Sequence, residues 1–157
     1  MVRFKNRYFT VEIVPEDGHH SSSTSFPEAL PLKENDIYKA VCQVTEKIHG
    51  EFGAAAIMTG LSVKYCNEHT RIGVIRCRHG PHRLLASSLP FLDKIGAKKV
   101  QIQGIYTGAT IVKCFKFLKK YHKERLGEAL RLCKNEDSKN KLTEKLSTIN
   151  YLKEFKE

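Results

Sequence analysis

The sequence lacks long hydrophobic runs and the short motifs of the common enzyme classes. No stretch of its 157 residues approaches the roughly 18 consecutive apolar residues that a membrane-spanning helix needs. The first residues, 1–7, do not form the apolar core of a secretory signal, and we expect none here. G-x-S-x-G, the Walker phosphate loop and H-E-x-x-H are also absent. The sequence therefore offers no familiar catalytic motif.

Cysteine is sparse and irregularly placed. The five cysteines form no C-x-x-C pair, and their number is odd. This usage is typical of a reducing compartment, the cytosol or the nucleus, in which most of them are small buried side chains. Cys77, His79 and His82 form C-x-H-x-x-H, with Cys66 upstream. Structural zinc sites usually offer a second close pair, so we expect no metal on the protein.

Acidic residues are scarce in one part of the chain. Residues 71–125 contain 13 basic and two acidic side chains, a net charge of +11, whereas the rest contains 14 and 15, a net charge of −1. This asymmetry indicates a polyanionic partner for the basic segment. A solvated basic surface without a partner is the alternative.

Hydrophobic periodicity predicts alternating strands and helices. Apolar residues alternate in four segments and recur with helical spacing in three. The expected strands are 7–14, 56–66, 71–78 and 98–106, and the expected helices are 35–50, 81–95 and 110–133. The order predicts an α+β fold, a ferredoxin-like or RRM-like βαββαβ antiparallel sheet with additional C-terminal helices. We assign residues 1–134 to one ferredoxin-like domain with a long loop at 15–33, and 135–157 to a helical or partly ordered charged tail.

Local signals set the expected element ends. Asn35 or Asp36 can cap the first helix, and Gly50 with Gly53 can end it. Pro90 should bend or end the second helix. Residues 67–70, Asn-Glu-His-Thr, have the composition of a turn between two strands.

The expected third helix places its lysines on one side. At 100° per residue they fall within an arc of roughly 120°, opposite an apolar side. These candidate RNA-binding residues are Lys113, Lys116, Lys119, Lys120 and Lys123. Ammonium groups about one turn apart match phosphates spaced along a nucleic-acid backbone. Lysine binds backbone phosphate but does not distinguish one base from another, so we predict that this helix positions folded RNA or DNA.

Five further cations are candidates for RNA binding. Arg3, Lys5 and Arg7 share one side of the chain if the first residues are extended. Arg76 and Arg78 stand in the expected strand 71–78, where an RNA-recognition sheet would instead carry aromatic residues for base stacking. Two other functions stay open: a protein-interaction module whose partner contacts the RNA, and a small nuclease or metal enzyme.

Several motifs in order along the chain resemble one known family. The main stretches are Met1-Val2-Arg3-Phe4-Lys5-Asn6-Arg7-Tyr8, Ile48-His49-Gly50-Glu51-Phe52-Gly53-Ala54-Ala55-Ala56 and Gly108-Ala109-Thr110-Ile111-Val112-Lys113-Cys114-Phe115-Lys116-Phe117-Leu118. Between them lie Tyr65-Cys66-Asn67, Ile75-Arg76-Cys77-Arg78 and Ser88-Leu89-Pro90-Phe91. Together they resemble the POP-five/Rpp-fourteen family of protein subunits of eukaryotic ribonuclease P and ribonuclease MRP. The resemblance covers residues 1–126 except the loop, and Arg71 departs from a glycine that family members often have after the turn threonine.

The resemblance implies a role in a ribonucleoprotein of the nucleus and nucleolus. It implies a non-catalytic subunit of the particle that removes the 5′ leader from precursor tRNA, and a share in the particle that cleaves precursor rRNA. Magnesium is then expected on the catalytic RNA, and no cofactor on the protein. The implied partners are ribonuclease P RNA, MRP RNA, a barrel-folded Rpp-thirty/Rpp-one-type subunit and other particle proteins, with precursor tRNA reached indirectly and no membrane. The implied RNA-facing regions are the terminus at 3–7 and the helix beginning near Thr110.

Overall fold

The computed structural model describes residues 4–16 and 30–132. The chain divides after Cys114 into two units, Met1–Cys114 and Phe115–Glu157, whose relative placement is not determined. Within the described segments, no helix has the length and hydrophobicity needed to cross a membrane. The predicted tail and domain boundary lie at or beyond the last of these residues, so both stay predictions.

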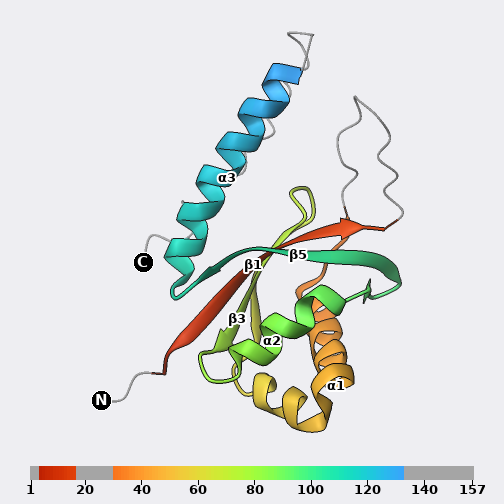
Figure 1. The fold of residues 1–157 in the computed structure, drawn as a ribbon. Helices are drawn as coiled ribbons and strands as arrows, with labels where there is room; N and C mark the ends of the chain where they lie inside the picture. Colours follow the sequence, from red (N-terminus) through yellow and green to blue (C-terminus); the bar gives the residue numbers. More distant parts are fainter. Residues whose placement is uncertain (1–3, 17–29, 133–157) are drawn as a thin grey trace. The chain divides into compact units, whose positions relative to one another are not determined.

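The first unit is built on a five-stranded antiparallel sheet (Figure 1). Its strands are β1 (Asn6–Pro15), β2 (Ser62–Asn67), β3 (Ile72–Arg78), the two-residue β4 (Lys94–Ile95) and β5 (Lys98–Gly108). Their order across the sheet is β2-β3-β1-β5-β4, with all paired neighbours antiparallel. β1 and β3 are therefore central, as in a ferredoxin-like fold, and the predicted α+β class is confirmed.

Helices α1 (Glu34–Met58) and α2 (His82–Ser88) lie on the same face of this sheet (Figure 1). A short 3-10 turn, η1 (Leu89–Phe91), follows α2 directly. Helix α3 (Ile111–Leu132) begins in the first unit and continues into the second. The predicted third helix at 110–133 is thus confirmed within one or two residues.

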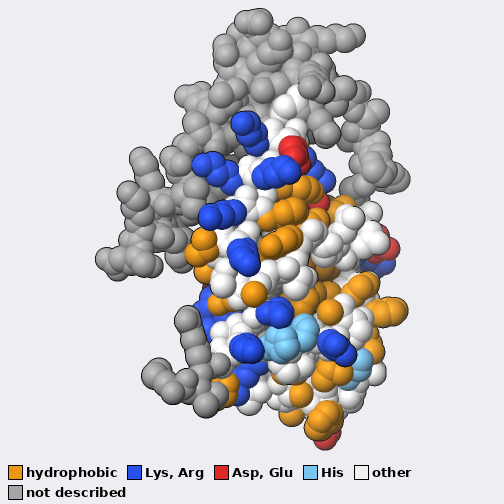
Figure 2. Space-filling view, turned by 60° about the vertical axis from the view of Figure 1, so that its left-hand side comes forward, with side chains coloured by type: hydrophobic (Ala, Val, Ile, Leu, Met, Phe, Trp, Pro, Cys, Tyr) orange, Lys and Arg blue, Asp and Glu red, His pale blue; other side chains and the backbone are white. Residues whose placement is uncertain are grey.

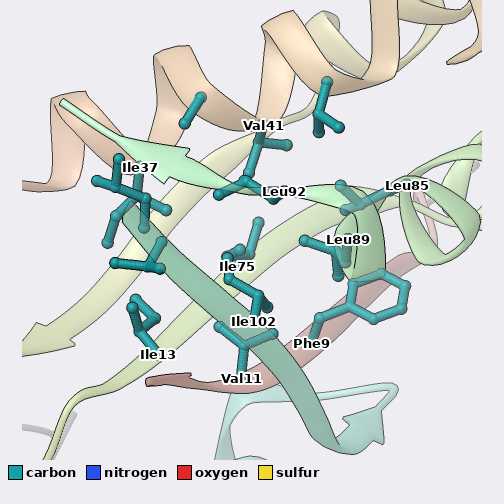
Figure 3. Packing of buried hydrophobic residues seen from close by; sticks show 14 of the residues in the cluster. Phe9, Val11, Ile13, Ile37, Val41, Ile75, Leu85, Leu89, Leu92 and Ile102 are labelled. Carbon is teal, nitrogen blue, oxygen red and sulfur yellow. The ribbon is translucent and has the colours of Figure 1, made fainter. Parts of the chain in front are cut away.

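Alternation in β1 creates the core between sheet and helices. Phe9, Val11 and Ile13 are buried on the helix side, as the sequence pattern predicts. Figure 3 shows them facing apolar side chains from the other elements, among which Ile37, Val41, Ile75, Leu85, Leu89, Leu92 and Ile102 are labelled. Because this face is closed by packing, a functional site on the sheet must lie at its ends or on its other face.

Helix α1 corrects two predictions. It does not stop at Gly50 but kinks there and runs on to Met58, so residues 56–61 are not the start of a strand. Gly50 has φ 68° and ψ −172°, backbone angles open essentially to glycine alone, and the alanines that follow favour a second helical segment. The helix begins at Glu34, so Asn35 and Asp36 lie inside its first turn and do not cap it.

The segment after α2 corrects a third prediction. Pro90 ends the helix within a 3-10 turn, so Leu92 and Ile95 are not part of a helical stripe. Both side chains are nevertheless buried. The apolar spacing therefore predicts correctly which residues are buried but not their secondary structure, because a turn and a short strand can cover the same part of the core as a helix.

The expected loop at 15–33 is structured at its C-terminal end. Leu30 and Leu32 are buried in the core, and the Leu30 amide donates a hydrogen bond to the carbonyl of Glu68 at 3.2 Å. Residues 17–29 lie outside the described part of the chain. The end of this segment thus belongs to the packed domain.

Candidate nucleic-acid interface

The lysine side of α3 is exposed as predicted. Cys114, Phe115 and Leu118 are buried, whereas the predicted lysines are all exposed. We call Lys113, Lys116, Lys119, Lys120 and Lys123 the helix row. Figure 2 shows lysine and arginine side chains following one another along this helix. The row has the geometry expected for phosphate contacts, and RNA binding by these residues stays a prediction.

One acidic residue lies beside the helix row. Lys120 Nζ is 3.7 Å from Glu124 Oε1 in an exposed i,i+4 pair. Such pairs contribute only about 0.3–0.5 kcal/mol, so a polyanion can displace the glutamate easily. The other four lysines form no ion pair with any residue in the described segments. The row therefore keeps most of its positive charge available.

The N-terminal cations lie at one end of the sheet. Arg3 falls outside the described residues. The His79 amide donates to the Lys5 carbonyl at 2.9 Å, so the chain before β1 lies against the end of β3. Alternation places Lys5 and Arg7 on the same side as Phe9, beyond the edge of the core. Lys5 is exposed and Arg7 half-buried.

Arg76 and Arg78 lie on the other face of the sheet. They pair with Tyr8 and Asn6 in the β1–β3 register and alternate with Cys77, which faces the core. The Arg78 guanidinium carbon is 4.5 Å from the centre of the Phe4 ring, a cation–π contact. Arg76 is half-buried, and its Nε has no hydrogen-bond partner in the described segments. The predicted cations of the sheet are thus divided between two faces, since Arg76 and Arg78 lie on the face opposite to Lys5 and Arg7.

Three side chains absent from the predicted site stand beside Lys5 and Arg7. His79, directly after β3, and His82 and Arg83, the first residues of α2, lie at the same end of the sheet. We call Lys5, Arg7, His79, His82 and Arg83 the sheet-end cluster. Desolvation is the largest cause that lowers the pKa of His79, and the next causes are the positive charges of Arg7, His82, Lys5 and Arg83. The hydrogen bond between His79 and Lys5 and the start of α2 at His82 place these groups at the same end of the sheet.

The two histidines of the cluster contact each other. Their ring centres are 4.7 Å apart with the planes at 30°. His82 Nδ1–H donates to the carbonyl oxygen of His79, because a carbonyl can only accept.

The C-x-H-x-x-H residues do not converge on a metal position. Cys77 is buried in the core, whereas His79 is exposed. The Cys66 thiol packs against the core and donates to the Leu32 carbonyl at 3.8 Å, and burial, then Glu34 and Glu68, raise its pKa to about 11. Residues 4–16 and 30–132 contain no group of three side chains placed to hold a metal ion. The cysteines here behave as packing residues.

Comparison with known proteins agrees with the ordered motifs. Residues 7–119 match the model of the Rpp14/Pop5 family. The chain is 38% identical to the Danio rerio protein named Ribonuclease P/MRP protein subunit POP5, over 88% of this chain and 81% of that protein. It is 31% identical to the Homo sapiens protein of the same name, over 100% of this chain and 94% of that protein.

A structural comparison finds a weaker likeness. A chain in a cryo-EM structure of yeast Ribonuclease MRP aligns with a TM-score of 0.44 and 14% identity, over 82% of this chain and 97% of that chain. This likeness is too distant to support an argument about function. The match over residues 7–119 and the identities above 30% are sufficient without it, and they show that this chain belongs to the Rpp14/Pop5 family.

Proposed function

We propose that this chain is a non-catalytic protein subunit of ribonuclease P and of ribonuclease MRP, and that it stabilises the folded RNA of the particle. Family membership and the names of its relatives support the assembly. The observation that supports RNA binding is the helix row, in which exposed ammonium groups follow one side of α3. Lysines spaced in this way neutralise successive backbone phosphates and release counterions.

The chemistry of cleavage is assigned to the RNA in this proposal. Magnesium ions on the RNA would activate water for removal of the 5′ leader of precursor tRNA and for cleavage of precursor rRNA. The protein would supply cations that bring RNA segments together, and it would bind no cofactor itself. A barrel-folded Rpp-thirty/Rpp-one-type subunit is the proposed protein partner, and the nucleus and nucleolus are the proposed location.

Charge-removing variants of the helix row test this proposal. We would purify RNA that the tagged chain pulls down from its own cells, transcribe it, and measure its affinity for the full chain over a range of salt concentrations. Changing Lys116, Lys119 and Lys123 to glutamine should weaken binding and flatten the salt dependence. Each lost phosphate contact lowers the slope of log K against log salt by roughly 0.7–0.9, so the triple variant should lose up to about 2 to 3 units.

A matched control removes the same charge elsewhere. Lys39, Lys47 and Lys64 are exposed on α1 and β2, outside the helix row. Their change to glutamine should leave the slope close to that of the original chain. Equal losses in both triple variants would reject a located site and leave only nonspecific attraction by net charge.

An interaction module is the second candidate. Phe52 in α1 and Phe91 in η1 are 83% and 68% exposed, which is typical of residues that contact a protein partner. In this case the partner would make the RNA contacts. The isolated chain would then bind the transcribed RNA no more tightly than the helix-row variant does, which separates the two candidates.

A further inference from the structure

The sheet-end cluster draws cations from three parts of the fold. Lys5 precedes β1 and Arg7 lies at its start, His79 follows β3, and His82 with Arg83 begins α2. The hydrogen bond from the His79 amide to the Lys5 carbonyl joins the first two parts. The contact between the two imidazole rings joins the second to the third. The group is therefore built by tertiary pairing and is separate in sequence from the helix row.

No carboxylate balances this charge within the segments that form the cluster. The sequence has no aspartate or glutamate from residue 1 to 11, and none from residue 69 to 92. Each charged group that acts on His79 is a cation, contributed by Lys5, Arg7, His82 or Arg83. None of the five side chains forms an ion pair with a residue in the described ranges. Such a concentration of unneutralised cations favours an anionic ligand.

The histidines make the charge of the cluster variable. Desolvation and the neighbouring cations lower the pKa of His79, so this ring is predominantly neutral at pH 7 without a ligand. A bound anion would reverse this balance because it attracts the protonated form of this ring.

We propose that the sheet-end cluster is a second RNA contact, in which His79 takes up a proton as a backbone phosphate binds between the two histidine rings and the side chains of Lys5, Arg7 and Arg83. This inference rests on the proposed function, since it takes RNA as the source of the phosphate. It adds three residues to the interface and makes RNA affinity dependent on pH. By linkage, the affinity rises as pH falls, by up to about tenfold per pH unit for each proton taken up.

The test measures the affinity of the full chain for the transcribed particle RNA between pH 8 and pH 6 at constant ionic strength. The original chain should bind more tightly as the pH falls. The variant with His79→Gln and His82→Gln should lose this pH dependence, because glutamine does not titrate. Both side chains are at the surface or half-buried, so the variant should keep its fold, which its thermal unfolding midpoint checks.

Two further variants separate titration from general charge. His69→Gln changes an exposed histidine in the β2–β3 turn and should keep the full pH dependence. Lys5→Gln combined with Arg83→Gln leaves the histidines in place and should lower the salt slope by up to about two units. Inorganic phosphate provides a further test, as a competitor of the RNA at millimolar concentration. If phosphate binds with the same pH dependence and the same sensitivity to these variants, the ligand is a phosphate ion, and the assignment to RNA is overturned.

The outcomes distinguish the inference from the function on which it rests. An unchanged pH dependence in the double histidine variant overturns the sheet-end contact even if the helix-row variant binds RNA weakly. Loss of pH dependence in that variant, with an unaffected helix-row variant, supports the sheet-end contact and rejects the role of α3. Absence of RNA binding by the original chain rejects both.

Discussion

At the scale of single residues, Arg71 adopts a backbone conformation that favours glycine. Its φ is 56°, and a left-handed backbone costs residues other than glycine about 1–2 kcal/mol. The surrounding bonds hold the conformation. Asn67 Oδ1 accepts from the amides of His69 and Thr70 at 2.9 and 3.0 Å, and the Ile13 amide donates to the Arg71 carbonyl at 2.8 Å. The predicted turn forms although its sequence is not ideal.

Gly108 offers a residue-scale prediction about the start of α3. A Cβ at this position would lie 2.9 Å from Cys114 Sγ and 3.1 Å from a ring carbon of Tyr106. Gly108→Ala must therefore displace one of these side chains, and such overpacking typically costs about 1–3 kcal/mol. We expect a loss of this size in the free energy of unfolding, measured with urea.

Gly104 provides the control for that experiment. It lies in the same strand, and nothing stands within 4 Å of a Cβ added there. Gly104→Ala should leave the free energy of unfolding within about 1 kcal/mol of the original, because it changes chain entropy without crowding. Equal destabilisation of the two variants would mean that crowding at Cys114 is not the cause.

At the scale of elements, the kink in α1 is the main result that periodicity did not predict. Alternation between residues 57 and 65 suggests a long strand, yet helix-forming alanines continue α1 to Met58 and leave only Ser62–Asn67 for β2. Of the alternating residues, Ile57 lies inside α1, whereas only Val63 and Tyr65 belong to β2. Ala54 and Ile57 are buried on the packed side of α1, and this packing favours a helix over a strand for these residues.

Replacing Gly50 should therefore affect the whole helix. Gly50→Ala meets no atom within 4 Å, so any cost comes from the backbone angles alone. Residues forced into such a region lose about 1–3 kcal/mol, and we expect a decrease of this size in the free energy of unfolding. Gly80→Ala, which also meets no atom and has no positive φ, is the matched control and should change stability little.

At the scale of the whole molecule, positive charge is concentrated in two separate groups, the helix row on α3 and the sheet-end cluster on β1, β3 and α2. They share no side chain, and only the sheet-end cluster can titrate near neutral pH. A net charge of +10 alone would attract RNA to any part of the surface. Two defined groups lead to a more specific prediction. Removing charge inside them should lower the affinity for RNA more than removing the same charge elsewhere.

Losses from the two groups should add. Combining the triple helix-row variant with Lys5→Gln and Arg83→Gln should weaken the binding free energy by the sum of the separate losses, within about 0.3–0.5 kcal/mol. The affinity of each variant for the transcribed RNA, measured at one fixed salt concentration, tests this. A combined variant that binds as well as the weaker of its two parents would show that each group contributes only when the other is present.

Features that depend on local geometry could be predicted from the amino-acid sequence alone. Element order, the inward face of β1 and the exposed lysine side of α3 follow from periods of two and 3.6 residues, which need no distant neighbour. Ordered motifs also identified the family. The sheet-end cluster could not be predicted in this way, because antiparallel pairing of β1 with β3 brings Lys5 and Arg7 to His79, which is far away in the sequence. The absence of acidic residues from both segments can be read in the sequence. The proximity of the two segments cannot, since it depends on strand register.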